Sequence, residues 1–341
     1  MSLRNSIRSA VWIVPLLVGS LWMLASVSAA YDADDPPQFG PWSAPVNLNN
    51  FPTSGASSIN SVFTEVNPFI SKDGLSLFFA CDGCPGNYGG FDLYVSQRAS
   101  IADPWGPPQN LGPTVNTPYT EANPALSNDE HSLFFTSNRP DGFDGFRNFG
   151  GVDIYVSRRH SKRDDFGWQA PENLGPGVNS EFNDRAPAYF EDEKTGAISL
   201  FFHSDRRGGL RPDDIYASTL QPYETFGPAV LVPELSSDRN DQEPAIRRDG
   251  LEIFFASNRF GGIGGGGGGI DLWASTRAST SDPWSPPVNL GPIVNTLNHE
   301  GGPALSWDGT TLYFASAGRA DGNGPFLDLY MTTREKLKGQ D

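Results

Sequence analysis

The sequence has 341 residues and an acidic balance, with 40 acidic and 24 basic side chains and a formal net charge of −16. This charge excludes functions that need a basic face, namely nucleic-acid binding and attachment to an anionic membrane surface. Gly and Pro number 38 and 29, aromatic residues make up 12%, and charged residues make up only 19%. Many turn formers, many aromatics and few charges are typical of short strands joined by tight turns.

Residues 1–30 have the pattern of a signal peptide. Arg4 and Arg8 form a positive start, an apolar run extends from Val11 to Leu24, and small residues at 27–30 offer a cleavage site. An uncleaved membrane anchor is the alternative, but the apolar run is short for a membrane span and contains Pro15. We therefore expect an exported protein, periplasmic or extracellular. Its mature chain would have no transmembrane span and would begin with a linker over residues 31–40.

Five repeats follow, and each is anchored by an aromatic residue. The anchors are 63, 63, 58 and 58 positions apart: Trp42, Trp105, Trp168, Phe226 and Trp284. The repeats fill residues 41–334 and leave residues 335–341 as a C-terminal tail. Such a fixed period is the pattern of a repeat architecture, so we expect no second domain.

Each repeat contains four apolar runs bounded by Gly, Pro, Asn or Asp, and none has helical spacing. The third run has the form Leu-Phe-Phe or close to it in every repeat, beginning at Leu77, Leu133, Leu200, Ile253 and Leu312. Four strands at this period predict one blade of a β-propeller. The last repeat ends after the strand that begins at Asp328, so residues 42–48 should supply its outermost strand and close the ring. The predicted fold class is an all-β, five-bladed β-propeller with four-stranded blades.

The motifs inside the repeats resemble a known family. The pattern acid-x-x-Pro, Ser-x-Asp-Gly, Leu-Phe-Phe, Ser-Asn-Arg, Gly-Gly, Asp-Ile-Tyr-Val is similar to the WD40-like propeller repeat. That repeat occurs in TolB-type periplasmic proteins and in envelope proteins with an OmpA-type peptidoglycan-binding domain. The resemblance covers residues 41–334. It implies an exported, TolB-like repeat protein that acts as a binding or scaffold module.

One acidic position recurs in all five repeats, three residues before the Pro of the second run: Glu65, Glu121, Asp184, Asp241 and Glu300. If that run is the innermost strand, these carboxylates would ring the mouth of the central channel and bind a cation or a sugar. The alternative is that each carboxylate caps backbone N–H groups of its own turn or pairs with an Arg of a neighbouring blade. Suitable arginines follow the third run in four repeats: Arg139, Arg206, Arg259 and Arg319.

Residues that occur in a single repeat are the better functional candidates, because a position required in every blade is usually structural. His299 precedes Glu300 at the expected channel mouth, and Trp307 lies in the same repeat. His203 stands where other repeats have Ala or Thr, which is typical of a packed strand residue. A long loop contains Phe143, Phe146 and Phe149, and these side chains either form a recognition surface or fold inward.

Cys81 and Cys84 are the only cysteines. In an exported protein a local disulfide is the favoured interpretation, two free thiols are the alternative, and two thiols alone do not complete a zinc site. We predict no metal and no cofactor. Calcium is the one open possibility, because the sequence from Gly266 fits a calcium-binding nonapeptide template. A glycine run matches that template by chance, and a glycine-rich hairpin tip is the favoured interpretation.

These features lead to two hypotheses about function. The first is a monomeric, non-catalytic propeller that binds a protein or polysaccharide of the cell envelope or the extracellular space. The alternative is a glycoside hydrolase, since five-bladed propellers also carry arabinanase- and fructosidase-type enzymes with carboxylates in the central funnel. In that case Glu300 would be the acid and Asp184 or Glu65 its partner. The uniformity of the five acids counts against it, because such enzymes need carboxylates in unlike environments.

Overall fold

The computed structural model describes residues 38–50, 58–140, 151–210, 213–222, 225–263 and 269–337. Within these ranges the regular structure is β-strand, apart from one short 3₁₀ helix, η1 (Leu48–Asn50). The strands form five antiparallel sheets, which confirms the predicted five-bladed propeller. No helix in this part of the chain is long and apolar enough to cross a membrane. The expected signal peptide lies outside the described residues.

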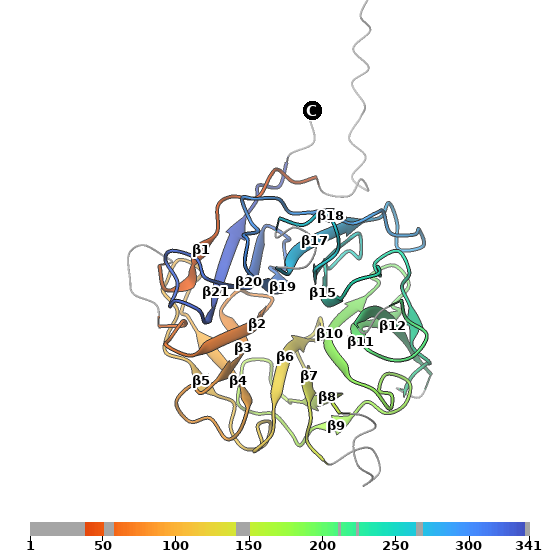
Figure 1. Ribbon diagram of the computed structural model, residues 1–341. Helices are drawn as coiled ribbons and strands as arrows, with labels where there is room; N and C mark the ends of the chain where they lie inside the picture. The colour runs from red at the N-terminus through yellow and green to blue at the C-terminus, as the bar shows by residue number, and fades with distance from the viewer. Residues whose placement is uncertain are drawn as a thin grey trace, which may run out of the picture. The chain divides into compact units, whose positions relative to one another are not determined.

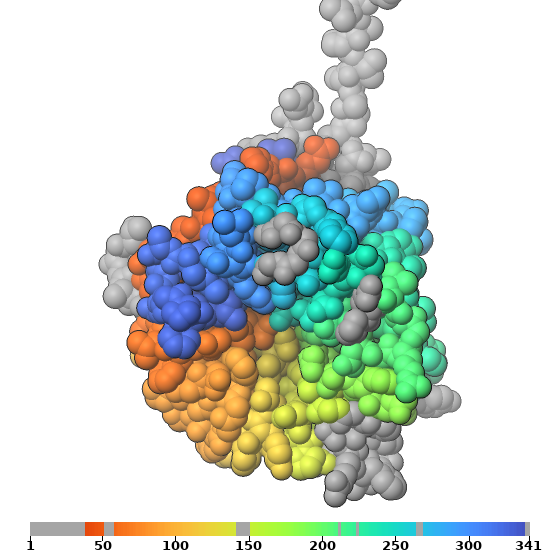
Figure 2. Space-filling view, in the orientation of Figure 1, coloured from red at the N-terminus to blue at the C-terminus, as the bar shows by residue number. Residues whose placement is uncertain are grey.

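The sheets follow one another around a central axis as five blades, each with its first strand innermost (Figure 1). The same order appears on the face drawn in Figure 2, where the colours run around the ring. In the first blade the strands are β2 (Thr64–Ile70), β3 (Ser76–Asp82), β4 (Phe91–Gln97) and β5 (Gln109–Asn110); in the second, β6 (Glu121–Leu126), β7 (Ser132–Ser137), β8 (Asp153–Arg158) and β9 (Glu172–Asn173). The third has β10 (Asp184–Glu191), β11 (Ile198–Ser204), β12 (Asp214–Gln221), β13 (Thr225–Phe226) and β14 (Val230–Leu231). The fourth has β15 (Asp241–Ile246), β16 (Glu252–Ser257), β17 (Asp271–Thr276) and β18 (Val288–Asn289); the fifth, β19 (Glu300–Leu305), β20 (Thr311–Ala317), β21 (Leu327–Thr333) and β1 (Val46–Asn47).

The ring closes through the N-terminal strand, as the sequence predicts. β1 pairs with β21 in the register Val46↔Met331 and Asn47↔Tyr330 and becomes the outermost strand of the fifth blade. A second contact crosses the same junction, where the Asn60 amide donates to Leu329 O at 2.9 Å and accepts from Leu329 N at 2.7 Å. These bonds remove two open sheet edges.

The same asparagine contact joins successive blades elsewhere. Asn116 bonds both backbone groups of Leu93 in the preceding blade, at 2.8 and 2.9 Å, and Asn179 and Asn295 do the same to Ile154 and Leu272. Within the blades, buried aromatics of the Leu-Phe-Phe runs stack on aromatics of the following strand, as Phe135 and Tyr155 illustrate. Each buried Asn amide bonds backbone N–H and C=O groups of the preceding blade, so it fixes the position of one blade against the next.

Every innermost strand contains a bulge at the same place. The pairing register shifts between the second and the fifth residue of the strand segment that begins at the repeated acid, for example between Gln242 and Ala245. The residue two positions after the acid then has φ between 50° and 58°, in the left-handed region: Asn67, Asn123, Ala186, Glu243 and Gly302. A bulge re-aims a side chain, so these five residues are turned toward the axis of the ring.

Candidate functional site

The five repeated acids do not line the central channel. Each is wholly buried at or near the start of its innermost strand, and none lines the channel cavity. In the second blade Glu121 accepts hydrogen bonds from Thr117 N, Thr117 Oγ1 and Ser137 Oγ, each at 2.7 Å. This burial contradicts the expectation that the acids ring the channel mouth. It equally contradicts Glu300, Asp184 and Glu65 as catalytic acids, because no oxygen of theirs is open to a substrate.

Four of the repeated acids pair with the predicted arginines, and each arginine belongs to the same blade rather than to a neighbouring one. The N···O distances are 3.2 Å for Arg139–Glu121, 2.5 Å for Arg206–Asp184, 2.5 Å for Arg259–Asp241 and 3.3 Å for Arg319–Glu300. The Arg139 guanidinium also donates to Val115 O at 2.5 Å and lies over the Phe135 and Tyr155 rings. These ion pairs fasten the two inner strands of a blade to the loop that precedes them.

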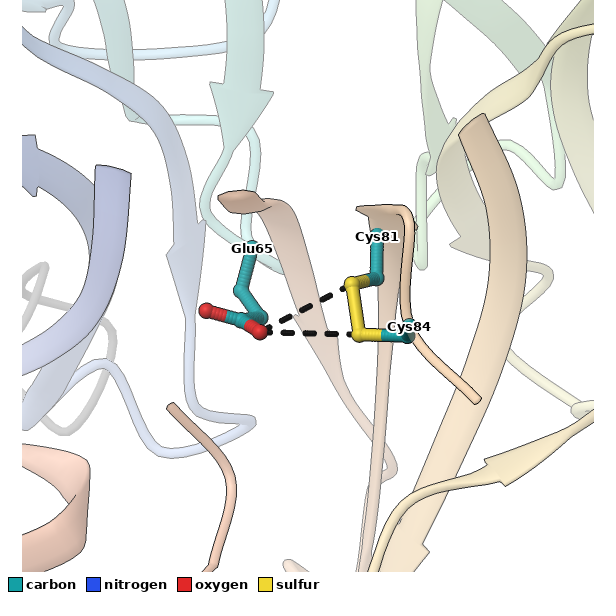
Figure 3. Close-up of side chains that lie close together, drawn as sticks. All are labelled: Glu65, Cys81 and Cys84. Atoms are coloured by element: carbon teal, nitrogen blue, oxygen red, sulfur yellow. Dashed lines mark hydrogen bonds between the residues drawn. A yellow bond between two sulfur atoms is a disulfide. The ribbon is translucent and has the colours of Figure 1, made fainter. Parts of the chain in front are cut away.

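The first blade replaces this pair with a disulfide between Cys81 and Cys84. Both sulfur atoms contact Oε1 of Glu65, at 3.6 and 3.5 Å, as Figure 3 shows. Burial raises the pKa of Glu65 to about 7, and hydrogen bonds from Ser61 oppose this rise. Within the described residues, these three side chains are the one group whose atoms could meet at a metal ion, and the disulfide occupies both sulfurs.

The central channel contains a cavity of about 120 Å³. One end is formed by the five bulge residues, and the walls by the prolines and apolar residues that follow them in each innermost strand. At the other end lies Trp307, where Lys72 Nζ sits 3.9 Å and the Arg248 guanidinium 5.0 Å from the centroid of a Trp307 ring. Trp307 is therefore at the hairpin-turn end of the channel, away from His299.

Glu243 is the one acidic residue among the five bulge residues. Its carboxylate accepts hydrogen bonds from Asn67 Nδ2 at 2.8 Å and from Gly302 N at 2.6 Å, so it joins three blades across the axis. Its φ of 53° is shared with the equivalent residues of the other blades and belongs to the bulge, so what distinguishes Glu243 is its side chain. The side chain is half-buried and lines the cavity, so its carboxylate is accessible from the channel.

Charged and polar side chains of the third blade lie beside Glu243. The buried His203 ring accepts from Glu243 N through Nδ1 at 3.2 Å, and Arg185 is its cross-strand partner. Burial lowers the pKa of His203 to about 4; Arg185 lowers it further, while Glu243 and Asp205 oppose this. His203 is therefore neutral at neutral pH and can act as a hydrogen-bond acceptor.

Asp213 and His299 complete this group, which we call the axial cluster: Arg185, His203, Asp205, Asp213, Glu243 and His299. Asp213 accepts from Gln242 Nε2 at 2.7 Å, and burial raises the pKa of its carboxyl. His299 approaches from the fifth blade. A Cβ added to Gly301 would lie 2.8 Å from Glu243 Oε2 and 3.0 Å from His299 Nε2, so these two groups flank the same small space.

Sequence reasoning singled out His203 and His299 and missed Glu243, Asp205, Asp213 and Arg185. A signal was present, because the position two residues after the repeated acid reads Asn, Asn, Ala, Glu, Gly along the five repeats. Simple strand alternation assigns that position to the same side as the buried acid. Because of the bulge, the repeated acid points into the blade and the residue two positions later points to the channel. The residue pattern alone did not predict this bulge.

No protein-family model and no curated protein matches the sequence. Solved structures do share the fold. An alpha-L-arabinofuranosidase from Podospora anserina matches with a TM-score of 0.55 and 14% identity over 88% of this chain and 98% of that one. An alpha-L-arabinofuranosidase from Lactobacillus brevis matches with 0.54 and 14%, over 81% and 92%. An endo-1,4-beta-xylanase from Bacteroides thetaiotaomicron matches with 0.50 and 12%, over 82% and 97%.

These neighbours correct two expectations. They are five-bladed glycoside hydrolase propellers rather than WD40-like or TolB-type repeat propellers, so the resemblance to the WD40-like repeat family is wrong. The repeat motifs follow from the needs of a blade, namely turn formers, a Leu-Phe-Phe strand and an acid–Arg pair, and such needs do not identify a family. The prediction of a non-catalytic scaffold is overturned with it, because the solved structures that share the fold are described as glycoside hydrolases.

Two sequence-based candidates fall outside the described residues. The aromatic loop with Phe143, Phe146 and Phe149 lies in the undescribed range 141–150, and most of the glycine run lies in 264–268.

Proposed function

We propose that the protein is a glycoside hydrolase whose reaction takes place at the axial cluster. The observation that carries this proposal is the position of Glu243, an accessible carboxylate on the axis of the ring. The glycoside hydrolases that share the five-bladed fold support the same reaction class. Hydrolysis of a glycosidic bond needs two carboxylates in unlike environments, one ionised and one protonated.

The axial cluster offers such a pair. Glu243 accepts two hydrogen bonds, from Asn67 and Gly302, which hold its carboxylate in place on the axis, so we assign it the role of base or nucleophile. Asp213 has a raised pKa because burial and the nearby Asp205 charge both disfavour ionisation, so we assign it the role of general acid. Arg185 and His299 are suited to hydrogen-bond the hydroxyl groups of a sugar beside these carboxylates.

The names of the neighbours suggest which substrates to test first. Two are described as alpha-L-arabinofuranosidases and one as an endo-1,4-beta-xylanase. We therefore propose a polysaccharide or oligosaccharide containing arabinofuranosyl or xylosyl units as the substrate. An exported location agrees with such a substrate, since these glycans lie outside the cell.

The test is hydrolysis of aryl arabinofuranosides, aryl xylosides and arabinoxylan by the purified chain, followed as released product. Glu243→Gln keeps the shape of the side chain and removes the charge, so we expect kcat to fall at least about 100-fold with the fold retained. Asp213→Asn should reduce kcat and remove the basic limb of the pH–rate profile, because that limb would report loss of the acid proton.

The matched control is Glu172→Gln. Glu172 is an exposed surface acid, 68% accessible, in a surface ion pair with Arg158. This variant should hydrolyse as the wild type does. Glycan binding by the wild type with no product on any of these substrates would contradict the hydrolase proposal, as would full activity of a folded Glu243→Gln variant.

A further inference from the structure

The repeated acid of the first blade lacks the cation that the other four blades supply. In blades two to five an Arg side chain lies within 3.3 Å of the acid. A Ser of the second strand donates to that acid in blades two, four and five, and in blade three it accepts from the Arg. In the first blade Cys81 stands at the position of that Ser, and Cys84 follows three residues later. Glu65 is wholly buried, and its Oε2 atom has no hydrogen-bond partner among the described residues.

Three potential ligand atoms therefore meet in one buried place. The sulfur atoms of Cys81 and Cys84 and a carboxylate oxygen of Glu65 all lie within 4.8 Å of one another (Figure 3). Two thiolates are too few for a stable zinc site, whereas two thiolates and a carboxylate supply the three protein ligands of an open tetrahedral site. The sequence reveals the two sulfurs, and the fold adds Glu65 from β2 as the third ligand.

We propose that reduction of the Cys81–Cys84 disulfide creates a binding site for one divalent, thiol-preferring cation such as Zn²⁺, held by Cys81, Cys84 and Glu65. The reductant is a phosphine or a dithiol. It breaks the S–S bond, delivers two electrons, and is itself oxidised to the phosphine oxide or to a disulfide. With a phosphine, one water molecule supplies the oxygen of the phosphine oxide and the two protons of the new thiols; with a dithiol, the two protons come from the dithiol itself. Metal binding releases these protons again as the sulfurs become thiolate ligands.

The charge of the site selects the class of metal. Two thiolates and one carboxylate leave a small net negative charge around a divalent ion and a larger one around a monovalent ion. A buried net charge is costly, so the divalent ion is favoured. Soft sulfur ligands then favour Zn²⁺ or Cd²⁺ over Mg²⁺ or Ca²⁺. The bound cation would neutralise Glu65 as the arginines neutralise the equivalent acids of the other blades.

The site lies directly beneath a short exposed loop. Cys81 and Cys84 are buried, but Asp82, Gly83 and Pro85 beside them are exposed. A reductant and an ion can therefore approach through this short loop without unfolding the blade. The proposal does not depend on the proposed hydrolase function, because the axial cluster shares no residue with this site.

The experiment measures Cd²⁺ binding to the full chain before and after reduction with a phosphine, by the ultraviolet absorbance of the thiolate–Cd²⁺ bonds and by equilibrium dialysis. We expect one Cd²⁺ per reduced chain, displaced by Zn²⁺, and no Cd²⁺ on the disulfide form. Cys81→Ser/Cys84→Ser should bind none. Glu65→Gln should keep both thiols but weaken binding about tenfold or more, because it removes one ligand.

Circular dichroism checks that each variant is folded, and Glu172→Gln serves as the matched acid-to-amide control that should bind like the wild type. A reduced, folded wild-type chain that takes up no Cd²⁺ would overturn the proposal. Equal affinity of the wild type and a folded Glu65→Gln variant would also overturn it, since Glu65 would then not be a ligand.

Discussion

The carboxylates inside the blades and the carboxylate on the channel axis are close in sequence and opposite in environment. Asp241 is wholly buried and bonded to Ser257 and Arg259 of its own blade. Glu243, two residues later, lines the channel cavity and contacts two other blades. The difference teaches that a position repeated in every blade serves the blade, whereas a position that varies around the axis is free to serve a ligand.

The first blade shows how far the repeated position can depart from this pattern. It keeps the acid, Glu65, but exchanges the Arg for a disulfide. The blade still forms with the same strand order as the second and fourth blades, so the ion pair is one of several ways to satisfy the site. The first blade therefore serves as a natural variant in which a repeated acid is buried without an Arg partner among the described residues.

The largest effect is expected from removing one repeated acid. Glu121→Ala should destabilise the protein by about 3–5 kcal/mol, because the buried Arg139 loses its charged partner. Urea unfolding followed by fluorescence measures this. The same change at the exposed Glu172, whose partner Arg158 is 46% accessible, should cost about 1 kcal/mol or less. Similar losses at both positions would remove the distinction between repeated and surface acids.

A smaller effect is expected from the axial cluster as the pH falls. Burial lowers the pKa of His203 to about 4 in the folded protein, whereas an exposed histidine has an ordinary pKa of 6.5, so the unfolded chain binds a proton over this range and the folded chain does not. Its contribution to stability is therefore fully present above about pH 6.5 and declines by about 3 kcal/mol as the pH falls toward 4. Arg185, Asp205 and Glu243 are the charged groups that face the ring.

His203→Thr is the matched variant for this prediction. In the second blade Thr136 occupies the equivalent position and accepts from Ala186 N at 3.0 Å, so threonine can replace the histidine as acceptor. The wild type should lose about 3 kcal/mol more than His203→Thr between pH 7 and pH 4. Parallel stability curves for the two proteins would show that His203 does not titrate as described.

Removing the disulfide should have the smallest effect of the three. Cys81 and Cys84 are three residues apart and close a short loop, so Cys81→Ser/Cys84→Ser should cost about 2 kcal/mol. Thermal unfolding under oxidising conditions measures the loss. A loss as large as that of Glu121→Ala would mean that the first blade depends on its disulfide as strongly as the others depend on their ion pairs.

The fold could be predicted from the sequence because every blade repeats the same strand and turn motifs. The Leu-Phe-Phe strands, the turn residues and the extra N-terminal strand define the blades and the closure of the ring, which β1 and β21 confirm. The acid–Arg network was one of two alternatives, and only the structure shows that the pairs form within a blade. The axial cluster escaped prediction because Glu243 reaches the axis through a bulge, and because the cluster combines residues of three blades: His203 and Asp213 of the third, Glu243 of the fourth and His299 of the fifth.

The most direct test of the central claim is the comparison of Glu243→Gln with the wild type in one preparation, measuring hydrolysis of an aryl arabinofuranoside or xyloside together with the melting temperature. We predict that kcat falls at least about 100-fold while the melting temperature changes by no more than a few degrees. A Glu243→Gln protein that is equally stable and hydrolyses the substrate at the wild-type rate would contradict the claim that the chemistry resides on the axis.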